Sequence, residues 1–278
     1  MKICIPSKNR ASTIKTHLFF KPEDVLIFVE PEEVKRYQIF CPNYKIISIE
    51  KSDMGVSYAR NYILDHVNEK YIIMADDDYE KFGKRNSEGR YSELSNCQEI
   101  IDTIQKGLEE DRYIGYSIGD DLFGYYINVH SQNKKRLFIN KKVLMDFYGL
   151  NLDWLKENKV RYDENLKEGE DTDLTIQILI NKGKTCVDYL YSRSKKFKNE
   201  GGLSKERGIL YASKDLCVRR YIEYLTKKYG TEFISSTHDK QGYLKSKTVK
   251  FDLILKRLDI IKKNIEEFKK TEDKVSNQ

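Results

Sequence analysis

The residues Tyr-Ile-Ile-Met-Ala-Asp-Asp-Asp at positions 71–78 predict a buried strand with a chemical site at its end. A short apolar run such as Tyr71–Ala75 is typical of a strand that is buried on both faces of a sheet. The three carboxylates that follow repel one another, so their charge needs compensation. Alternate side chains of an extended segment point to one side, which pairs Asp76 with Asp78. We predict that this pair holds Mg²⁺ or Mn²⁺, which take oxygen ligands; the alternative is an acidic turn in which the aspartates only cap the chain.

Further strands and a helix are predicted on the N-terminal side of this run. Short apolar stretches bounded by turn residues predict strands at Lys2–Ile5, Val25–Val29 and Ile46–Ile49. Ser57 is a candidate N-cap for a helix that runs to about His66. Strands that alternate with helices in this way are typical of a mostly parallel sheet with crossover connections.

Helix and strand patterns continue downstream of the aspartates. Ser95–Gln98 has the spacing of a capping box, which predicts a helix through about Leu108. The sequence therefore predicts an α/β fold, in which a mostly parallel sheet is flanked by helices and followed by a mainly helical C-terminal region. The remaining patterns predict strands at Tyr113–Ile118, Tyr125–Val129, Leu137–Asn140 and Thr185–Leu190, and helices at Lys142–Tyr148, from Thr172 to Gly183, at 208–229 and, with a clear amphipathic repeat, at 251–268.

Polar clusters follow the other predicted strands, and parallel sheets bind their ligands at the carboxyl ends of strands. Pro6–Arg10 follows the first strand and offers cationic and amide groups to a diphosphate or a base. Glu30 follows the second strand, where its carboxylate can accept hydrogen bonds from a base or a ribose. Gly55 stands at a helix N-terminus, which favours anions, and Arg60 lies one turn further on. Each cluster taken alone is also compatible with a plain polar turn.

The segment Glu168–Asp173 places carboxylates directly before an apolar helix. Carboxylates at a helix N-terminus are usually caps, and Asp171 or Thr172 fits that role. In the functional alternative, one of these carboxylates removes the proton from an attacking hydroxyl group.

Charge and composition narrow the class of protein. The chain has 278 residues, of which 39% are hydrophobic and 34% charged, and this composition is typical of a packed domain. The net charge of +6 divides into −5 for residues 1–181, +10 for residues 182–250 and +1 for residues 251–278. A basic segment behind an acidic body indicates a polyanionic partner, although an ordinary solvated lysine-rich surface has the same composition.

The sequence predicts a cytoplasmic protein. Its apolar runs are shorter than the roughly 18 residues of a membrane span, and its first residues lack the features of a signal peptide. Five cysteines without Cys-x-x-Cys spacing argue against a disulfide framework and against a zinc site, which favours a reducing compartment.

In order and spacing, these motifs resemble those of the GT-A-type nucleotide-sugar glycosyltransferases over residues 1–190. Within that superfamily, Ile5–Arg10, Ala75–Asp78 and Asn199–Leu203 look most like the TET/JBP-associated glycosyltransferases, which are largely phage enzymes that attach sugars to hydroxymethylated DNA bases. The resemblance implies a GT-A-like (Rossmann-like) catalytic domain at 1–190, with a basic helical region at 191–278 packing on it. The motifs that carry the resemblance are Pro6–Arg10, Glu30, Gly55–Asn61, Asp76–Asp78, Arg136–Lys142 and Glu170–Asp171.

The resemblance also implies roles for single residues in a metal-dependent transfer from a UDP-sugar. Asp76 and Asp78 would hold Mn²⁺ or Mg²⁺ against the diphosphate, and Asp77 would lie near the ribose or the donor sugar. Asp171 would be the general base if the reaction inverts the anomeric centre and a sugar ligand if it retains it, while Glu170 would position the acceptor or the sugar. The residues implied in donor binding are Pro6, Lys8, Arg10, Glu30, Gly55, Arg60, Asp76 and Asp77.

The acceptor that the resemblance implies is a hydroxymethylated base, 5-hydroxymethylcytosine, in duplex phage DNA. Such a base has to be flipped out of the stack, and contacts to the DNA backbone have to offset that cost. The basic segment supplies candidates, whose binding would weaken steeply with salt. The residues implied in acceptor and DNA binding are Arg193, Lys195, Lys196, Lys198, Gly201 and Gly202. A phage-encoded enzyme would work in the host cytoplasm.

Other functions stay open at this point. A GT-A glycosyltransferase could act on a polysaccharide, a lipid carrier or a protein, and its basic segment would then meet an anionic membrane. A nucleotidyltransferase uses the same metal chemistry, and a non-catalytic DNA-binding protein could keep the scaffold. The third metal ligand is also open, because His130 and His238 lie in no motif of the family.

Overall fold

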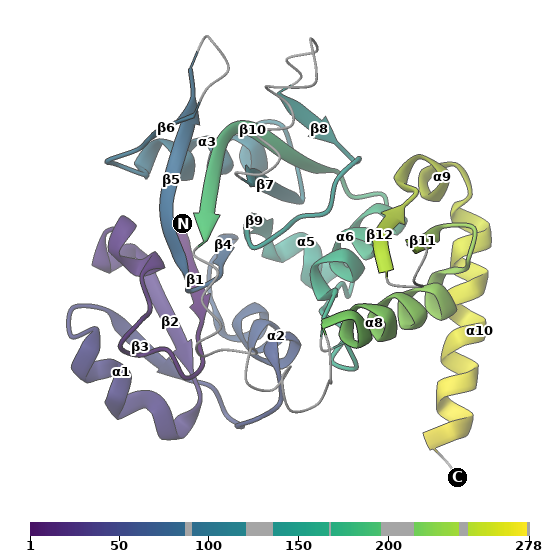
Figure 1. The fold of residues 1–278 in the computed structure, drawn as a ribbon, viewed down its shortest axis with the longest axis horizontal. Coiled ribbons are helices and arrows are strands. Elements are labelled where there is room, and N and C mark those ends of the chain that lie inside the picture. Colours follow the sequence, from purple (N-terminus) through teal and green to yellow (C-terminus); the bar gives the residue numbers. More distant parts are fainter. Residues whose placement is uncertain (87–90, 121–135, 167, 196–213, 239–243, 277–278) are drawn as a thin grey trace.

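The computed structural model describes residues 1–86, 91–120, 136–166, 168–195, 214–238 and 244–276, and most of its strands lie in one large sheet (Figure 1). The strands of this sheet are β1 (Lys2–Pro6), β2 (Val25–Val29), β3 (Lys45–Ser48), β4 (Tyr71–Ala75), β5 (Tyr79–Arg85), β6 (Tyr91–Glu93), β7 (Gly115–Asp120), β8 (Leu137–Ile139), β9 (Phe147–Asn151) and β10 (Thr185–Lys195). Their order is β3-β2-β1-β4-β9-β7-β10-β5-β6, and β8 pairs with β10.

The N-terminal half of the sheet is parallel, because β3, β2, β1 and β4 pair in that direction. Successive residues of β1 enter opposite hydrophobic clusters, so both faces of the strand are buried. Ile3 and Ile5 share a cluster with residues of α1 (Val34–Phe40) and α3 (Gln98–Glu109), whereas Cys4 shares one with residues of α2 (Val56–His66), α5 (Leu152–Glu157) and α6 (Glu170–Ile180). The predicted α/β class, with helices on both sides of a sheet, is confirmed.

The second half of the sheet is mixed. The predicted helix at Lys142–Tyr148 is wrong, because residues 147–151 form β9, which runs antiparallel between β4 and β7. Phe147 and Tyr148 enter clusters on opposite faces, which a strand permits, and Gly149 lets α3 lie close, since an added Cβ would stand 2.3 Å from Ile104. A short apolar run fits either a helix or a strand, and here the open edges of β4 and β7 decide the outcome. Strand β10 is likewise antiparallel to β5.

Two predicted helix caps are absent, although both helices form. Helix α2 follows Gly55, and the Ser57 hydroxyl donates to the Leu166 carbonyl at 3.0 Å instead of capping. Helix α3 follows Cys97, without the reciprocal bonds of a capping box; instead the Asn96 side chain accepts from the Gln98 N–H at 2.8 Å. The predicted strand at 125–129 lies outside the described residues.

The C-terminal region packs on α6 through a third hydrophobic cluster. The C-terminal region contains α8 (Lys214–Tyr229), the paired strands β11 (Ile234–His238) and β12 (Leu244–Val249), α9 (Phe251–Lys256) and α10 (Leu258–Ser276). The helix predicted at 251–268 is interrupted at Arg257, between α9 and α10. Ile176 and Leu179 of α6 meet Ile254 and Ile261 in this cluster, so the region is held by apolar packing.

Shortening Ile261 to valine tests this packing. Ile261 is fully buried, so Ile261→Val is expected to lower the free energy of unfolding by about 1 kcal/mol. The neighbouring Ile260 is 41% exposed, and Ile260→Val is the matched control with little expected effect. Urea unfolding measures both, and equal stabilities would show that α10 does not pack as described.

Candidate active site

The predicted donor and catalytic residues gather at the carboxyl ends of β1, β2 and β4 and at the N-termini of α2 and α6. Both helices begin after a glycine with a positive φ, +89° at Gly55 and +79° at Gly169. This backbone conformation is unfavourable for other residues, and it turns the chain sharply into each helix. The turns place Arg60 in α2 and Glu170 and Asp171 in the first turn of α6 toward the end of β4.

Arg60 is the buried centre of the site. Its guanidinium donates to Asp76 at 3.0 Å, to Glu170 at 2.8 Å and to Asp171 at 2.5 Å, and it lies 5.5 Å from the centre of the Tyr162 ring. The side chain is 3% exposed. The structure therefore joins the Asp-Asp-Asp and Glu-Asp motifs, about a hundred residues apart in sequence, through one cation. We call Arg60, Asp76, Glu170 and Asp171 the Arg60 network.

Asp171 has partners that the sequence did not indicate. The Tyr148 hydroxyl donates to the same Asp171 oxygen as Arg60 does, at 2.7 Å, and it also lies 2.7 Å from the Tyr162 hydroxyl. Burial raises the pKa of Asp171, against the opposing charge of Arg60. Tyr148 belongs to the segment predicted as a helix, so its position became visible only with the pairing of β9.

Glu170 has a pKa raised to about 7, by burial and by the charge of Asp171. The folded protein therefore binds this proton more tightly than the unfolded chain, where the ordinary value is 4.5. The contribution to stability is present below pH 4.5 and is lost as the pH rises to about 7.

Glu170→Gln is expected to remove this loss. The stability of the variant relative to the wild type should rise between pH 4.5 and pH 7, because the amide stays neutral. Urea unfolding across this range measures the change, with Glu157→Gln as a control at an exposed position of α5. Parallel pH profiles of the wild type and Glu170→Gln would contradict the assignment.

The three consecutive aspartates face different surroundings. Asp77 is 5% exposed and turns back under the end of β1, where it accepts from Ser7 and Arg10. Burial raises its pKa to about 6, although the charge of Arg10 and the hydrogen bond from Ser7 act in the opposite direction. Asp77 therefore anchors the turn after β1 in this conformation. Arg10 also donates to Asp78 at 3.0 Å, which fixes Asp78 beside the same turn.

Lys195, at the end of β10, lies inward, although the family resemblance implies it in DNA binding. Its ammonium is 2.6 Å from Asp76, 3.6 Å from Asp78 and 3.2 Å from Asp146, and it lies over the Tyr79 ring. Burial opposes its charge, but Asp76 and the other neighbours raise the pKa of Lys195 well above its ordinary range. Burial also opposes the charge of Asp76, yet Lys195 and Arg60 lower the pKa of Asp76 to about 2. Lys195 and Asp76 are therefore both charged.

The same aspartates fit a divalent cation. Asp78 Oδ1 is buried and has no hydrogen-bond partner among the residues described. One carboxylate oxygen of Asp76 and one of Asp146 face Lys195 beside it. Hard divalent cations take such oxygens. In the described ranges, no three His, Cys, Asp or Glu side chains are assembled around a metal position. At the aspartates, Lys195 lies among the carboxylates instead.

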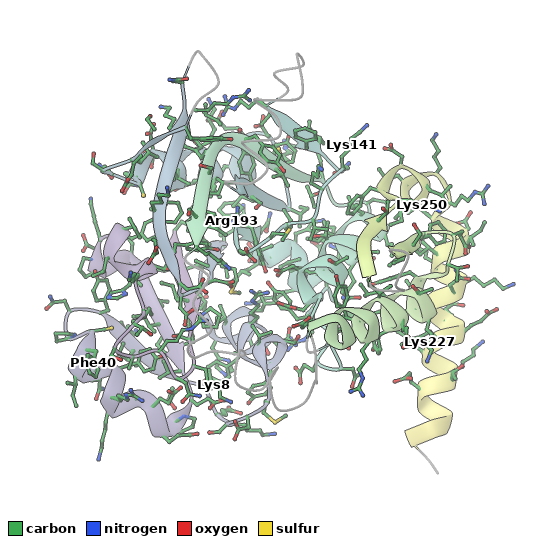
Figure 2. The ribbon with its side chains drawn as sticks, in the orientation of Figure 1. Lys8, Phe40, Lys141, Arg193, Lys227 and Lys250 are labelled. Atoms are coloured by element: carbon green, nitrogen blue, oxygen red, sulfur yellow. The ribbon has the colours of Figure 1, made fainter. Side chains whose placement is uncertain are left out.

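Arg193 is also turned inward. It is 4% exposed, and its guanidinium donates to the carbonyls of Ile118, Gly119 and Met145 at 2.5, 2.8 and 2.6 Å (Figure 2). These bonds tie β10 to β7 and to the chain before β9, so the predicted DNA contact does not match this position. The other four predicted acceptor residues, Lys196, Lys198, Gly201 and Gly202, lie outside the described residues.

The remaining predicted donor residues form the rim at β1 and β2. Pro6 ends β1, and Lys8 contacts Glu30 at 3.1 Å and Asp53 at its carboxylate. Glu30 in turn accepts from the Asp53 N–H at 2.7 Å. The structure thus brings the motifs after β1, β2 and β3 together, as the rule for parallel strands predicts.

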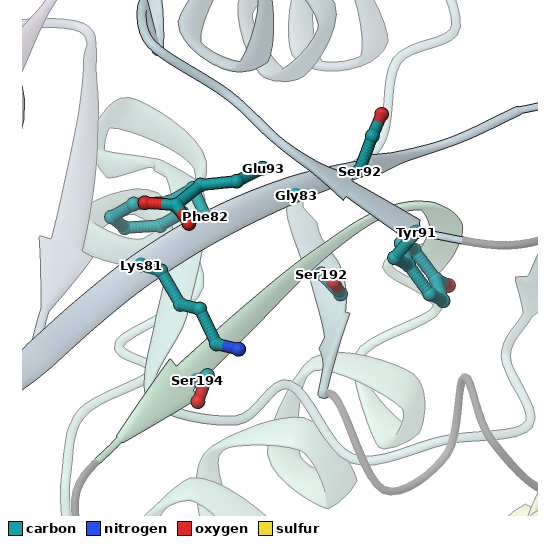
Figure 3. Close-up of a pocket in the computed structure, with 8 residues that line it drawn as sticks. All are labelled: Lys81, Phe82, Gly83, Tyr91, Ser92, Glu93, Ser192 and Ser194. Atoms are coloured by element: carbon teal, nitrogen blue, oxygen red, sulfur yellow. The ribbon is translucent and has the colours of Figure 1, made fainter.

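A separate cavity of about 230 Å³ lies between β5, β6 and β10 (Figure 3). None of the predicted site residues that the structure describes lines it. Its lining residues are Lys81, Phe82, Gly83, Tyr91, Ser92, Glu93, Ser192 and Ser194. As for membranes, none of the described helices combines the length and the apolar character of a bilayer span.

Solved structures with a similar fold include two proteins in complex with uridine diphosphate or a UDP-sugar. Glucosyl-3-phosphoglycerate synthase from Mycobacterium tuberculosis, in complex with Mg²⁺ and uridine diphosphate, is 9% identical, with a TM-score of 0.51 over 89% of this chain and 86% of that one. S. aureus TarS 1–349, in complex with UDP-GlcNAc, is 16% identical, with a TM-score of 0.50 over 81% and 67%. In the UDP complex of TarS 1–349, this chain spans 60% of that chain. These likenesses confirm the GT-A-type fold.

A search of curated protein sequences finds no match to this chain. The family model described as TET-Associated Glycosyltransferase, in contrast, matches residues 1–202. The match includes the whole Arg60 network and Lys195, and it confirms the resemblance drawn from the motifs and the expected enzyme class. The chain belongs to the TET-associated glycosyltransferase family.

Proposed function

We propose that the protein is a metal-dependent glycosyltransferase that moves a sugar from a UDP-sugar to the hydroxyl group of 5-hydroxymethylcytosine in phage DNA. The observation that carries the proposal is the Arg60 network, which places the Asp-Asp-Asp motif beside the Glu-Asp motif within the family region. A donor diphosphate bound at the first motif would thus lie next to a candidate base in the second. The family match favours this reaction over nucleotidyl transfer.

The donor side of the proposal rests on charge and on the fold. The similar structures contain uridine diphosphate or UDP-GlcNAc, and one contains Mg²⁺. In this chain we assign the nucleotide to the rim of Lys8, Arg10 and Glu30, near the end of β1. Asp76 and Asp78 would hold Mn²⁺ or Mg²⁺, which stabilises the negative charge of the leaving diphosphate.

On the acceptor side, Asp171 is the proposed proton acceptor. Both of its hydrogen bonds in the described part of the chain, from Arg60 and Tyr148, use Oδ1, so Oδ2 is available to the substrate. The acceptor hydroxyl oxygen forms a bond to the anomeric carbon, the bond from that carbon to the diphosphate oxygen breaks, and the hydroxyl proton passes to Asp171. Arg60 and Tyr148 hold the carboxylate in place for this step.

The DNA partner is proposed from the family name and from charge. Residues 182–250 carry a net charge of +10, and Lys196 and Lys198 remain the proposed phosphate contacts, with Gly201 and Gly202 allowing a close approach. We assign Arg193 and Lys195 to the interior instead. A phage enzyme of this kind acts in the host cytoplasm.

A transfer assay tests the proposal. Mn²⁺, a panel of UDP-sugars and a DNA duplex with either cytosine or 5-hydroxymethylcytosine are combined with the protein, and the nucleosides are analysed by mass spectrometry. We expect a mass gain of one sugar on the hydroxymethylated base only. EDTA and the Asp78→Ala variant should each abolish the gain, because both remove the proposed metal.

The controls separate the parts of this proposal. Asp153→Asn, at an exposed position of α5, should transfer sugar as the wild type does. Release of UDP without a change in the DNA would favour a polysaccharide, lipid or protein acceptor. Full turnover of Asp78→Ala in EDTA would refute the metal dependence.

A further inference from the structure

The ammonium group of Lys195 stands where three carboxylates from two different segments meet. Asp76 and Asp78 follow β4, and Asp146 precedes β9. We call Asp76, Asp78 and Asp146 the aspartate cluster. Lys195 Nζ lies 2.6, 3.6 and 3.2 Å from their oxygens, so one ammonium of the chain itself contacts all three carboxylates.

The sheet itself brings Asp146 into the cluster. In the antiparallel pair of β4 and β9, Ala75 lies opposite Phe147, so the next residues, Asp76 and Asp146, face each other. The Asp76 N–H donates to the Asp146 carbonyl at 3.0 Å, which continues this register. Opposite residues of an antiparallel pair project from the same face, where like charges destabilise the pair. The register therefore requires a cation between these two carboxylates.

Lys195 meets this requirement because of a change in strand register. The pairing of β10 with β5 shifts between Ser194 and Lys195, and Lys195 then lies opposite Tyr79. Such an irregularity re-aims a side chain at the end of a strand. Arg193, two residues earlier, is fixed by three backbone carbonyls, and its guanidinium also lies 3.6 Å from the Asp146 oxygen that faces Lys195. Lys195 is thus the cation that contacts all three aspartates.

One ammonium does not satisfy the cluster completely. Asp78 Oδ1 is buried and lacks a hydrogen-bond partner within the described ranges, and its distance of 3.6 Å to Lys195 is that of a charge contact only. Arg10 uses the other oxygen of Asp78, and Arg60 uses one oxygen of Asp76. The oxygens that face Lys195 are one from each aspartate, and the Asp146 oxygen also lies 3.6 Å from Arg193. Three such carboxylate oxygens are a suitable ligand set for a small divalent cation.

We infer that the Lys195 ammonium and the divalent cation are alternative occupants of one site formed by Asp76, Asp78 and Asp146. Lys195 neutralises the aspartates while the metal is absent and has to leave them when it binds, and Asp146 supplies the third carboxylate. This inference rests on the proposed metal-dependent function, and it adds a ligand and a competing group that the motifs did not indicate.

The test measures Mn²⁺ binding to the full chain without any donor, by the loss of the free Mn²⁺ signal in electron paramagnetic resonance. Lys195→Met keeps the apolar stem and removes the charge, so its Mn²⁺ dissociation constant should fall at least about tenfold below that of the wild type. Lys84→Met is the matched control, because it removes the same charge from β5, where Lys84 pairs with Glu99. Its dissociation constant should stay near the wild-type value.

The role of Asp146 is tested in the Lys195→Met background, where the competing ammonium is absent. Adding Asp146→Asn should weaken Mn²⁺ binding by about tenfold or more, since one ligand charge is lost. Binding that Asp146→Asn leaves unchanged would remove Asp146 from the site. Equal affinities of Lys195→Met and Lys84→Met, or no Mn²⁺ binding by any variant, would overturn the competition.

These outcomes are distinct from a failure of the proposed function. If the wild type transfers sugar in Mn²⁺ but not in EDTA, while Lys195→Met binds Mn²⁺ no more tightly, the function stands and the shared site is wrong. If transfer proceeds fully in EDTA, metal dependence fails, whatever the binding data show. Thermal unfolding of each variant without metal confirms that the compared proteins are folded.

Discussion

Asp171→Asn is expected to slow sugar transfer by about 10²- to 10⁴-fold, the range typical of a lost general base. Asparagine keeps the shape of the side chain and an oxygen that can accept from Arg60 and Tyr148, but it cannot take a proton. The rate is measured as sugar transferred per unit time at saturating donor. The Michaelis constant for the donor should change much less, because the nucleotide is assigned to the rim of Lys8, Arg10 and Glu30.

The stereochemistry of the product provides the control for Asp171. If nuclear magnetic resonance shows that the sugar configuration is inverted, a large loss of rate in Asp171→Asn supports the general base. If the configuration is retained, Asp171 is a sugar ligand. Wild-type turnover by a folded Asp171→Asn protein would remove Asp171 from either role.

Arg60→Met is expected to lower the free energy of unfolding by about 3–5 kcal/mol, if the variant folds at all. Methionine can fill much of the space, but it leaves Asp76, Glu170 and Asp171 without the cation that they share. Unpaired charges in a buried position are costly because they have lost their solvation. Urea unfolding at neutral pH measures the difference, and transfer activity should be lost with it.

Arg161→Met is the matched control for Arg60. Arg161 forms a two-point ion pair with Asp65, but its side chain is 47% exposed, so its loss should lower stability by no more than about 1 kcal/mol. Similar effects of the two substitutions would show that burial does not govern the Arg60 network.

Acidification should weaken the interactions of Asp76. Its pKa is lowered from the ordinary value of 3.8 to about 2, so the stability that this carboxylate contributes is complete above pH 3.8 and is lost as the pH falls toward about 2.

The sequence indicated much of the fold and the main members of the site. The apolar runs of β1, β2 and β4 were visible because strands buried on both faces have few polar residues. The polar residues after those runs were predicted to meet, since parallel strands end at one edge of the sheet. Lys8 and Glu30 do meet there, and Asp76 lies beside Arg60.

The sequence was less informative wherever a partner strand decides the outcome. Phe147–Asn151 could have been helical by its apolar pattern, and only the open edges of β4 and β7 make it a strand. Asp146 was not predicted for the same reason, because only the pairing of β4 with β9 places it opposite Asp76. The basic composition of the C-terminal third, likewise, did not reveal that Arg193 and Lys195 point inward.

The sequence by itself thus determined the class of the fold, the family and the chemistry available at the ends of the strands. These are local properties, written in runs of apolar residues and in the residue types that follow them. The tertiary structure alone decided which charges neutralise one another: Arg60 with Asp76, Glu170 and Asp171, and Lys195 with Asp76, Asp78 and Asp146. The physical reason is that electrostatic energy depends on distance and burial, which arise from the pairing of segments far apart in the chain.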